Sequence, residues 1–159
     1  MIERIDHINL VVDDMQAAIG FYCDLLGMRL TKQATIGGPW IDAMTGLSAV
    51  EADVAFVELP DGPGIELLHY RQPKGTRPEG LASPNTKGLR HFALRVGNLD
   101  ELAARMKAAG VRLVSEVQEV PAAQVDYADL HKRLLYCYDP EGNLLELCSY
   151  QSGKTTAGR

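Results

Sequence analysis

The chain has 159 residues and a formal net charge of −5, with 46% hydrophobic and 23% charged residues. This composition is typical of a globular protein rather than a disordered one, and the length fits one domain or two small half-domains. The acidic balance argues against nucleic acid and anionic membrane surfaces as partners, because both select for clustered Lys and Arg.

The segments that could report on cellular location point to the cytoplasm. The opening residues MIERIDHINLVV enter a strand pattern at once and leave no room for a signal peptide. No apolar run reaches membrane-spanning length. Cys23, Cys137 and Cys148 lack CxxC spacing and lie in apolar segments, so they are interpreted as reduced, packed thiols.

The first half of the chain predicts one strand, one helix and then three strands. Asp13 or Asp14 can cap the helix, and DGPG at 61–64 is typical of a hairpin turn. The stretch 37–47 favours a loop with a turn of helix. The expected elements lie at about 4–12, 14–26, 28–36, 50–59 and 64–70.

The second half predicts the same succession. Asn98 can cap its helix, and DPEGN at 139–143 provides its hairpin turn. The stretch 119–131 again favours a loop with a turn of helix. The expected elements lie at 89–96, 98–109, 111–118, 132–138 and 144–150. The sequence thus predicts an α+β fold of two tandem βαβββ modules, divided as module 1–70, linker 71–88, module 89–150 and flexible tail 151–159.

An internal repeat supports this division. DHINLVVDDM (6–15) aligns with RHFALRVGNL (90–99), which places His7 over His91. GMRL and GVRL follow the two helices, each with a glycine where a helix C-cap is needed. PDGPGIELLHY then aligns with DPEGNLLELCSY, which places Glu66 over Glu146.

Strand alternation gives these four side chains a common orientation. His7 and His91 lie opposite the apolar residues of their strands, and Glu66 and Glu146 do the same. If two-fold pseudosymmetry brings the modules together, two imidazoles and two carboxylates converge. Such a cluster is costly without a cation, and its N/O donors suit a divalent ion such as Zn, Ni, Co, Fe or Mn.

The doubled module, with GFYCDLLGMRL, the turn followed by IELL, and DPEGNLLEL, resembles the vicinal oxygen chelate superfamily over about residues 4–150. That superfamily includes glyoxalase I, methylmalonyl-CoA epimerase, extradiol dioxygenases and bleomycin-resistance proteins. The resemblance implies a cup-shaped mixed sheet around one metal ion, with His7, Glu66, His91 and Glu146 as ligands. It also implies a homodimer that acts on a small molecule.

The chemistry expected of such a site is proton transfer. Two open positions on the ion would take two neighbouring oxygens of a substrate and stabilise an enediolate or enolate. Glu146 and Glu66 are the candidate bases. The leading hypothesis is therefore a metal-dependent lyase or isomerase, similar to glyoxalase I or to an epimerase.

Two other functions stay open at this point. An extradiol-type Fe(II) or Mn(II) dioxygenase would use only His7, His91 and Glu146, and a fourth ligand at Glu66 argues against it. A non-catalytic drug-binding resistance protein would have no reason to carry all four ligand types.

The residues that would contact a substrate are less well marked. Arg95 shares a strand face with His91 and would suit a carboxylate or thioester oxygen. Trp40, Tyr70, Tyr127, Tyr150 and Cys148 are candidates for the wall of the cavity, although ordinary packing is the commoner role for such residues. His69 and His131 are not expected among the ligands.

Overall fold

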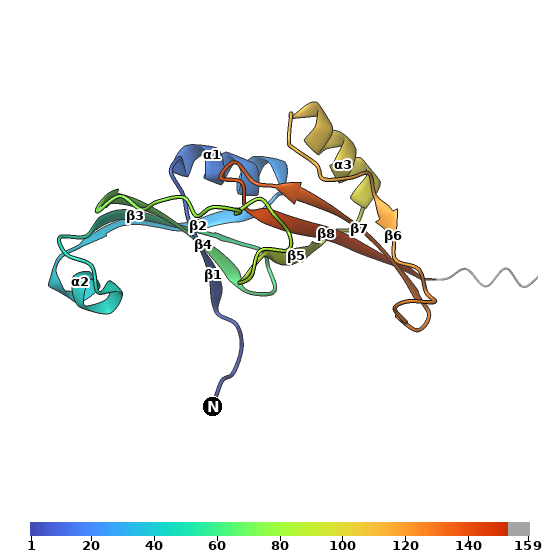
Figure 1. Ribbon diagram of the computed structural model, residues 1–159, viewed down its shortest axis with the longest axis horizontal. Coiled ribbons are helices and arrows are strands. Elements are labelled where there is room, and N and C mark those ends of the chain that lie inside the picture. The colour runs from blue at the N-terminus through green and yellow to red at the C-terminus, as the bar shows by residue number, and fades with distance from the viewer. Residues whose placement is uncertain (153–159) are drawn as a thin grey trace, which may run out of the picture. The chain divides into compact units, whose positions relative to one another are not determined.

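The computed structural model describes residues 1–152 and divides into two compact units, residues 1–79 and 80–159. Each unit contains one four-stranded mixed sheet, with strand order β1-β4-β3-β2 in the first and β5-β8-β7-β6 in the second (Figure 1). The predicted α+β fold with two βαβββ modules is confirmed. The flexible tail was predicted at 151–159. Gln151 and Ser152 instead belong to the last strand, β8, and residues 153–159 lie outside the described residues.

In the first unit, β1 runs parallel to β4, and β4 and β2 run antiparallel to β3. The Asp14 side chain accepts from the backbone N–H of Ala17 and so caps α1, which continues into a π-helical turn, η1. The elements are β1 (His7–Val11), α1 (Met15–Ile19), η1 (Gly20–Leu25), β2 (Arg29–Gly37), α2 (Pro39–Thr45), β3 (Glu51–Glu58) and β4 (Gly64–Gln72).

The helix α2 was expected only as a turn within a loop. It begins at Pro39, whose fixed φ suits the first helical position. Gly46 follows the helix with φ of 72° and ends it in a left-handed conformation that favours glycine. These two residues explain why the segment between β2 and β3 forms a helix of its own.

The second unit repeats the pattern, with β5 parallel to β8, and β8 and β6 antiparallel to β7. The Asn98 side chain accepts from the backbone N–H of Glu101 and caps α3, as predicted. The elements are β5 (His91–Arg95), α3 (Leu99–Ala108), β6 (Gln118–Glu119), β7 (Leu130–Tyr138) and β8 (Leu144–Ser152).

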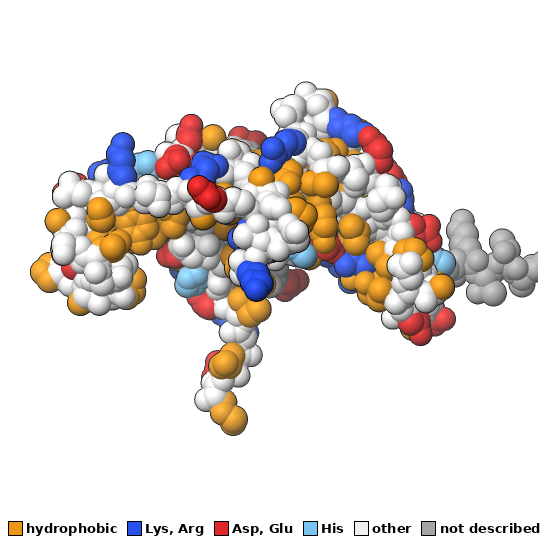
Figure 2. Space-filling model, in the orientation of Figure 1, with side chains coloured by type: hydrophobic (Ala, Val, Ile, Leu, Met, Phe, Trp, Pro, Cys, Tyr) orange, Lys and Arg blue, Asp and Glu red, His pale blue; other side chains and the backbone are white. Residues whose placement is uncertain are grey.

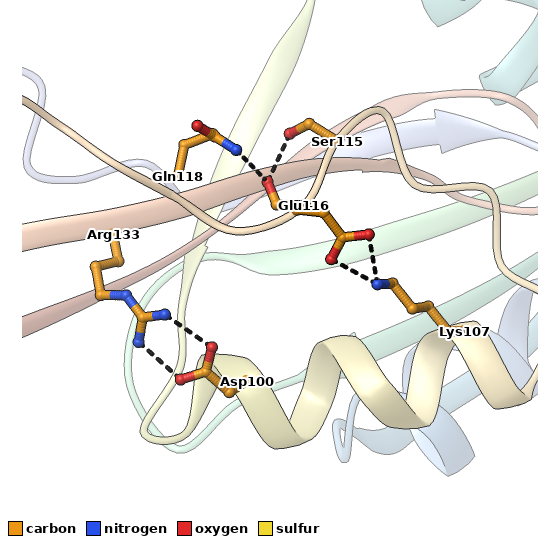
Figure 3. Close-up of polar contacts among 6 residues, drawn as sticks. All are labelled: Asp100, Lys107, Ser115, Glu116, Gln118 and Arg133. Carbon is orange, nitrogen blue, oxygen red and sulfur yellow. Dashed lines mark hydrogen bonds and ion pairs between the residues drawn. The ribbon is translucent and has the colours of Figure 1, made fainter.

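The strand predicted at 111–118 is wrong in its extent, since only β6 and an isolated bridge at Leu113 pair with β7. Figure 3 shows the physical reason. The side chains of Ser115 and Gln118 donate to the Glu116 carbonyl, and the Glu116 carboxylate binds Lys107 of α3. Side-chain hydrogen bonds to the backbone compete with strand pairing and interrupt this strand.

The two faces of each sheet have different roles. In the first unit, α1 contacts β3 and β4, and the inward residues Ile65, Leu67 and Val57 are buried. In the second unit, α3 contacts β8, where Leu145 and Leu147 are buried. His7, Glu66, His91 and Glu146 alternate with these apolar residues along the strands and belong to the opposite faces.

All three cysteines are free, as expected, and Cys137 and Cys148 are buried. Burial, followed by the charge of Asp139, raises the pKa of the Cys137 thiol to about 12. Among residues 1–152, no helix is long and apolar enough to cross a membrane.

Candidate functional site

The first unit brings His7 and Glu66 together, and they are called the first pair below. Their strands are parallel neighbours, with Asn9 of β1 level with Glu66 of β4. His7 Nε2 lies 3.5 Å from Glu66 Oε2, and the two side chains are 39% and 22% exposed. The pair is therefore formed by strand register and is open to an incoming ligand.

Neighbouring polar groups hold the first pair in place. His7 Nδ1 lies 3.0 Å from Asp6 Oδ2, which orients the imidazole and leaves Nε2 toward Glu66. This hydrogen bond to His7 is the largest cause of the lowered pKa of Asp6. Asn9 Nδ2 donates to Glu66 Oε2 over 2.8 Å. The Glu66 carboxylate thus has a neutral amide as its neighbour.

An apolar cluster lies further along this face of the first sheet. Ile41 of α2 is 2% exposed and packs with residues of β3 and β4, including Val54 and Leu68. Tyr70, a predicted substrate contact, is a half-buried member of this cluster. Trp40, another predicted contact, is 57% exposed on α2, where Figure 2 shows hydrophobic side chains at the surface.

A polar cavity of about 280 Å³ adjoins His7 within the first unit. Lys32 lies over the Phe56 ring at its edge, with Nζ 5.3 Å from the ring centroid. The cavity is lined by Arg4, Asp6, His7, Lys32, Phe56, Glu58, Leu59, Pro60, Gly62 and Gly64.

The second unit brings His91 and Glu146 together in the same way, and they are called the second pair. Ala93 of β5 is level with Glu146 of β8, as Asn9 is with Glu66. His91 Nε2 lies 3.5 Å from Glu146 Oε2. Here the carboxylate is almost fully buried, with its side chain 7% exposed, while His91 is 36% exposed.

A lysine from β7 partners the buried carboxylate. Lys132 Nζ lies 2.6 Å from Glu146 Oε1, and the Lys132 side chain is only 13% exposed. This ion pair compensates the burial of Oε1. Burial lowers the pKa of Lys132, but the hydrogen-bonding and charge interactions with Glu146 outweigh it, and the net pKa is raised.

A tyrosine stands directly across from Glu146 on β7. The register pairs Tyr136 with Glu146 and Lys132 with Tyr150. Burial first, and then the Glu146 carboxylate, raise the pKa of the Tyr136 phenol. The Tyr136 and His91 rings also contact each other, with centroids 5.2 Å apart.

Further along this face, two cations and two tyrosines cluster near Cys148. The guanidinium carbon of Arg95 lies 5.0 Å from the centroid of the Tyr150 ring. Lys132 Nζ lies 5.8 Å and 5.9 Å from the Tyr127 and Tyr150 centroids. Cys148 is 4% exposed, and burial is the main cause of its raised pKa, so its thiol is not an activated nucleophile.

The four predicted ligands therefore form one His/Glu pair in each unit. Within each unit, the described residues hold no larger cluster of His, Cys, Asp and Glu side chains suited to a metal ion. A nitrogen and an oxygen bound to one ion at ordinary bond lengths lie roughly 3.0–3.5 Å apart, so the separation of 3.5 Å in each pair fits shared ligation. The N/O donor set also fits a divalent first-row ion.

The other two histidines have separate roles. His69 Nδ1 lies 3.1 Å from the Val12 carbonyl, on the helix side of the sheet. His131 Nδ1 lies 3.1 Å from Glu119 Oε1 at the surface. Neither contact involves one of the four predicted ligands.

Sequence reasoning missed three residues that touch the glutamates: Asn9, Lys132 and Tyr136. Asn9 shares the face of His7 by simple alternation, so its contact was accessible from the pattern. The other two depend on the pairing of β7 with β8. The hairpin turn between β7 and β8 sets that register, and in this turn the Asp139 N–H donates to the Asn143 carbonyl.

Comparison with known proteins identifies the family. The sequence model of the Glyoxalase/Bleomycin resistance protein/Dioxygenase superfamily matches residues 4–147. The chain belongs to this superfamily. Its fold agrees: a glyoxalase family protein from Bacillus cereus superposes with a TM-score of 0.82 and 29% identity, covering 96% of this chain and 97% of that one.

The superfamily relatives differ in what their names say. An uncharacterized protein of Escherichia coli, YaeR, is 27% identical over 92% of this chain and 95% of its own length. An ethylmalonyl-CoA/methylmalonyl-CoA epimerase of Cereibacter sphaeroides is 30% identical over 72% of this chain and 76% of its own. Glyoxalase I of Leishmania major shares the fold, with a TM-score of 0.63 and 19% identity over 92% of this chain and 86% of that one.

Proposed function

We propose that this protein is a divalent-metal-dependent enzyme that moves a proton at a carbon next to a carbonyl, as a lyase or an isomerase. The observation that carries the proposal is the repetition of one His/Glu pair at equivalent positions of two modules. Each pair has the same Nε2–Oε2 separation of 3.5 Å. Structural packing alone gives no reason to repeat both residue types and their distance.

His7, Glu66, His91 and Glu146 would together hold one ion, with Zn, Ni, Co, Fe and Mn as the candidates. When bound, the ion supplies Lewis acidity toward the oxygens of the substrate, which acidifies the adjacent C–H. The small-molecule substrate and the homodimer expected from the sequence form part of the same proposal.

The two glutamates are suited to different parts of the work. Glu146 is nearly buried and fixed by Lys132 at 2.6 Å, which favours a constant position. Glu66 is more exposed, with the neutral Asn9 amide on Oε2, and is freer to reach a substrate proton. Placed in different modules, one carboxylate would accept a proton and the other return it, as isomerisation requires.

The first test is metal binding. We expect protein purified without chelator to contain close to one equivalent of a divalent ion by mass spectrometry. His7→Ala, His91→Ala, Glu66→Ala and Glu146→Ala should each lose most of it. His69→Gln and His131→Gln are the matched controls and should retain it. Equal metal content in all six variants would reject the ligand set.

The second test is proton exchange. The epimerase relative is named for ethylmalonyl-CoA and methylmalonyl-CoA, which are therefore the first compounds to assay for deuterium uptake from solvent. The hemithioacetal of methylglyoxal tests the glyoxalase alternative. Glu146→Gln and Glu66→Gln should abolish exchange, whereas His131→Gln should not. Oxygen uptake with catechols, without exchange in any of these compounds, would instead indicate a dioxygenase.

A further inference from the structure

The second sheet carries an excess of positive charge beside Glu146, in a chain whose net charge is −5. Strand register places Arg95 level with Cys148, and Lys132 level with Tyr150. Side chains on paired strands that are level with one another share a face. Both cations therefore lie on the face that carries His91 and Glu146.

Arg95 is exposed and has an aromatic neighbour but no anion. Its guanidinium stacks over Tyr150 at 5.0 Å, and among residues 1–152 no carboxylate pairs with it. In the same unit, Arg112 also stacks over a tyrosine, with its guanidinium carbon 3.7 Å from the Tyr138 centroid. Stacking orients a guanidinium while its N–H edge stays available, and that edge matches the two oxygens of a carboxylate.

Lys132 completes the cationic cluster. One face of its ammonium is taken by Glu146 Oε1, and the Tyr127 and Tyr150 rings lie 5.8 Å and 5.9 Å away. The two rings meet edge to face, with centroids 5.7 Å apart. The cations Arg95 and Lys132 with the single carboxylate of Glu146 give a net charge of one positive unit beside the two tyrosine rings.

The first module shows that the fold itself does not require this charge. The repeat places Val11 where the second module has Arg95, and Ala52 where it has Lys132. Ala52 is fully buried in the apolar cluster beneath Ile41. The cationic cluster is therefore a property of one module, at positions that the other module fills with apolar side chains.

We propose that Arg95, with Lys132 and the Tyr127/Tyr150 rings, binds a carboxylate group of the substrate, so that the enzyme acts on an acid. This inference deepens the proposed function, on which it rests for the link to catalysis, but the anion site itself requires no metal. A single excess positive charge suits a monoanionic carboxylate better than a phosphate dianion.

The test uses full-length protein stripped of metal by chelation and desalted, with propionate as the probe and inorganic phosphate as the comparison. Each is titrated while the side-chain Nε–H resonance of Arg95 is followed by NMR. We expect saturable propionate binding at millimolar concentrations. Arg95→Gln should weaken it about tenfold, the loss of one charge-assisted contact. Because this variant lacks the Arg95 resonance, its binding is followed through the backbone amides of Cys148 and Tyr150.

Three variants sharpen the result. Arg95→Lys keeps the positive charge but lacks the paired N–H donors of the guanidinium, so its affinity for propionate should lie between those of the wild type and Arg95→Gln. Lys132→Gln should also weaken propionate binding, because it leaves Glu146 to repel the anion. Arg112→Gln is the matched control, since it removes another tyrosine-stacked arginine and should leave binding unchanged. Thermal melting of each variant identifies any loss of folding.

The proposal is overturned if propionate fails to saturate, if Arg95→Gln binds it as tightly as the wild type, or if phosphate binds more tightly than propionate. Because metal is absent, these outcomes are independent of the metal-binding test. Loss of metal binding with intact propionate binding would remove the proposed function and leave the anion site. Intact metal binding without propionate binding would remove the anion site and leave the proposed function.

Discussion

The first and second pairs share their ligand types and spacing but lie in opposite surroundings. Around Glu66 the partner is a neutral amide, and the neighbouring sheet face is closed by an apolar cluster under α2. Around Glu146 the partner is a half-buried lysine, Lys132, and the neighbouring face carries Arg95 and two tyrosines. Duplication has kept the pair itself and changed its surroundings.

This difference teaches which parts of a repeated module are independent. The His/Glu pair depends on two parallel strands, whose register is the same in both units. The surroundings of each pair depend on β3 or β7 and on the segment before that strand. We call the cluster around Ile41 the apolar wall, and Lys132 with Arg95 and its tyrosine neighbours the charged wall. A helix at 39–45 supplies Ile41 in the first unit, whereas the corresponding loop of the second unit leaves the face to charged side chains. One wall is thus stabilised by burial and the other by ion pairing.

The largest expected effect tests the apolar wall. Ile41 is 2% exposed in the cluster, and Ile41→Ala should lower the free energy of unfolding by about 3 kcal/mol through lost burial and a cavity. Urea denaturation measures the change, and Ile41→Val is the control, expected to cost about 1 kcal/mol. Because no charge is involved, the loss should not depend on salt. A loss below that of the valine variant would show that α2 does not seal this face.

The charged wall should respond differently. Glu146→Gln leaves Lys132, 13% exposed, without its counter-charge. We expect a loss of about 2 kcal/mol in unfolding free energy, somewhat less than for full removal of one partner of a buried pair. The double variant Lys132→Met/Glu146→Gln should recover most of it, since it leaves no buried charge. The same urea measurement on Glu66→Gln should show a much smaller loss, and equal losses would contradict the distinction between the pairs.

These contrasts also mark how far the sequence could be followed. Helix caps at Asp14 and Asn98 and glycines with positive φ after the helices, Gly27 and Gly110, are local signals, and the structure has them where they were expected. The His/Glu pairs followed from the repeat and from strand alternation. Local signals for α2 were also present, in Pro39 and Gly46, but a short helix needs a core residue such as Ile41 to hold it.

The contact of Lys132 with Glu146 could not be predicted in the same way. The backbone register places Lys132 level with Tyr150, four residues along β8 from Glu146. A long, flexible side chain reaches back along the sheet to bury its charge, and alternation does not describe that reach. The prediction of a full strand at 111–118 was wrong for a related reason, because the side chains of Ser115 and Gln118 donate to the Glu116 carbonyl.

A smaller effect compares the two positions level with the glutamates, Asn9 and Ala93. Asn9→Ala removes the 2.8 Å hydrogen bond to Glu66 and should cost less than about 1 kcal/mol in unfolding free energy, since the site is partly exposed. Ala93→Asn, the reciprocal change, should be close to neutral because Glu146 already has Lys132. Urea denaturation of both variants measures the two changes in unfolding free energy. A larger loss for Ala93→Asn would mean that the second pair has no room for an amide.

The smallest effect lies on the opposite face of the first sheet and asks whether charge also contributes there. Hydrogen bonding from Thr35, with Arg71 adding to it, lowers the pKa of Asp53 from its usual value of 3.8. A carboxyl whose pKa is lower in the folded state stabilises the protein above the unfolded pKa, and that contribution is lost as pH falls below about 4. Stability measured by urea at pH 6 and pH 3 should therefore fall less in Asp53→Asn than in the wild type.

Glu51→Gln, at the exposed start of β3, is the matched control for Asp53→Asn and should keep the wild-type dependence on pH. If both variants lose stability equally between the two pH values, the Thr35–Asp53–Arg71 contacts contribute nothing to acid sensitivity. The first unit would then depend on apolar burial on both of its faces. Charge pairing as a means of stabilising a sheet would in that case be confined to the second unit, where Glu146 binds Lys132 and Asp100 binds Arg133.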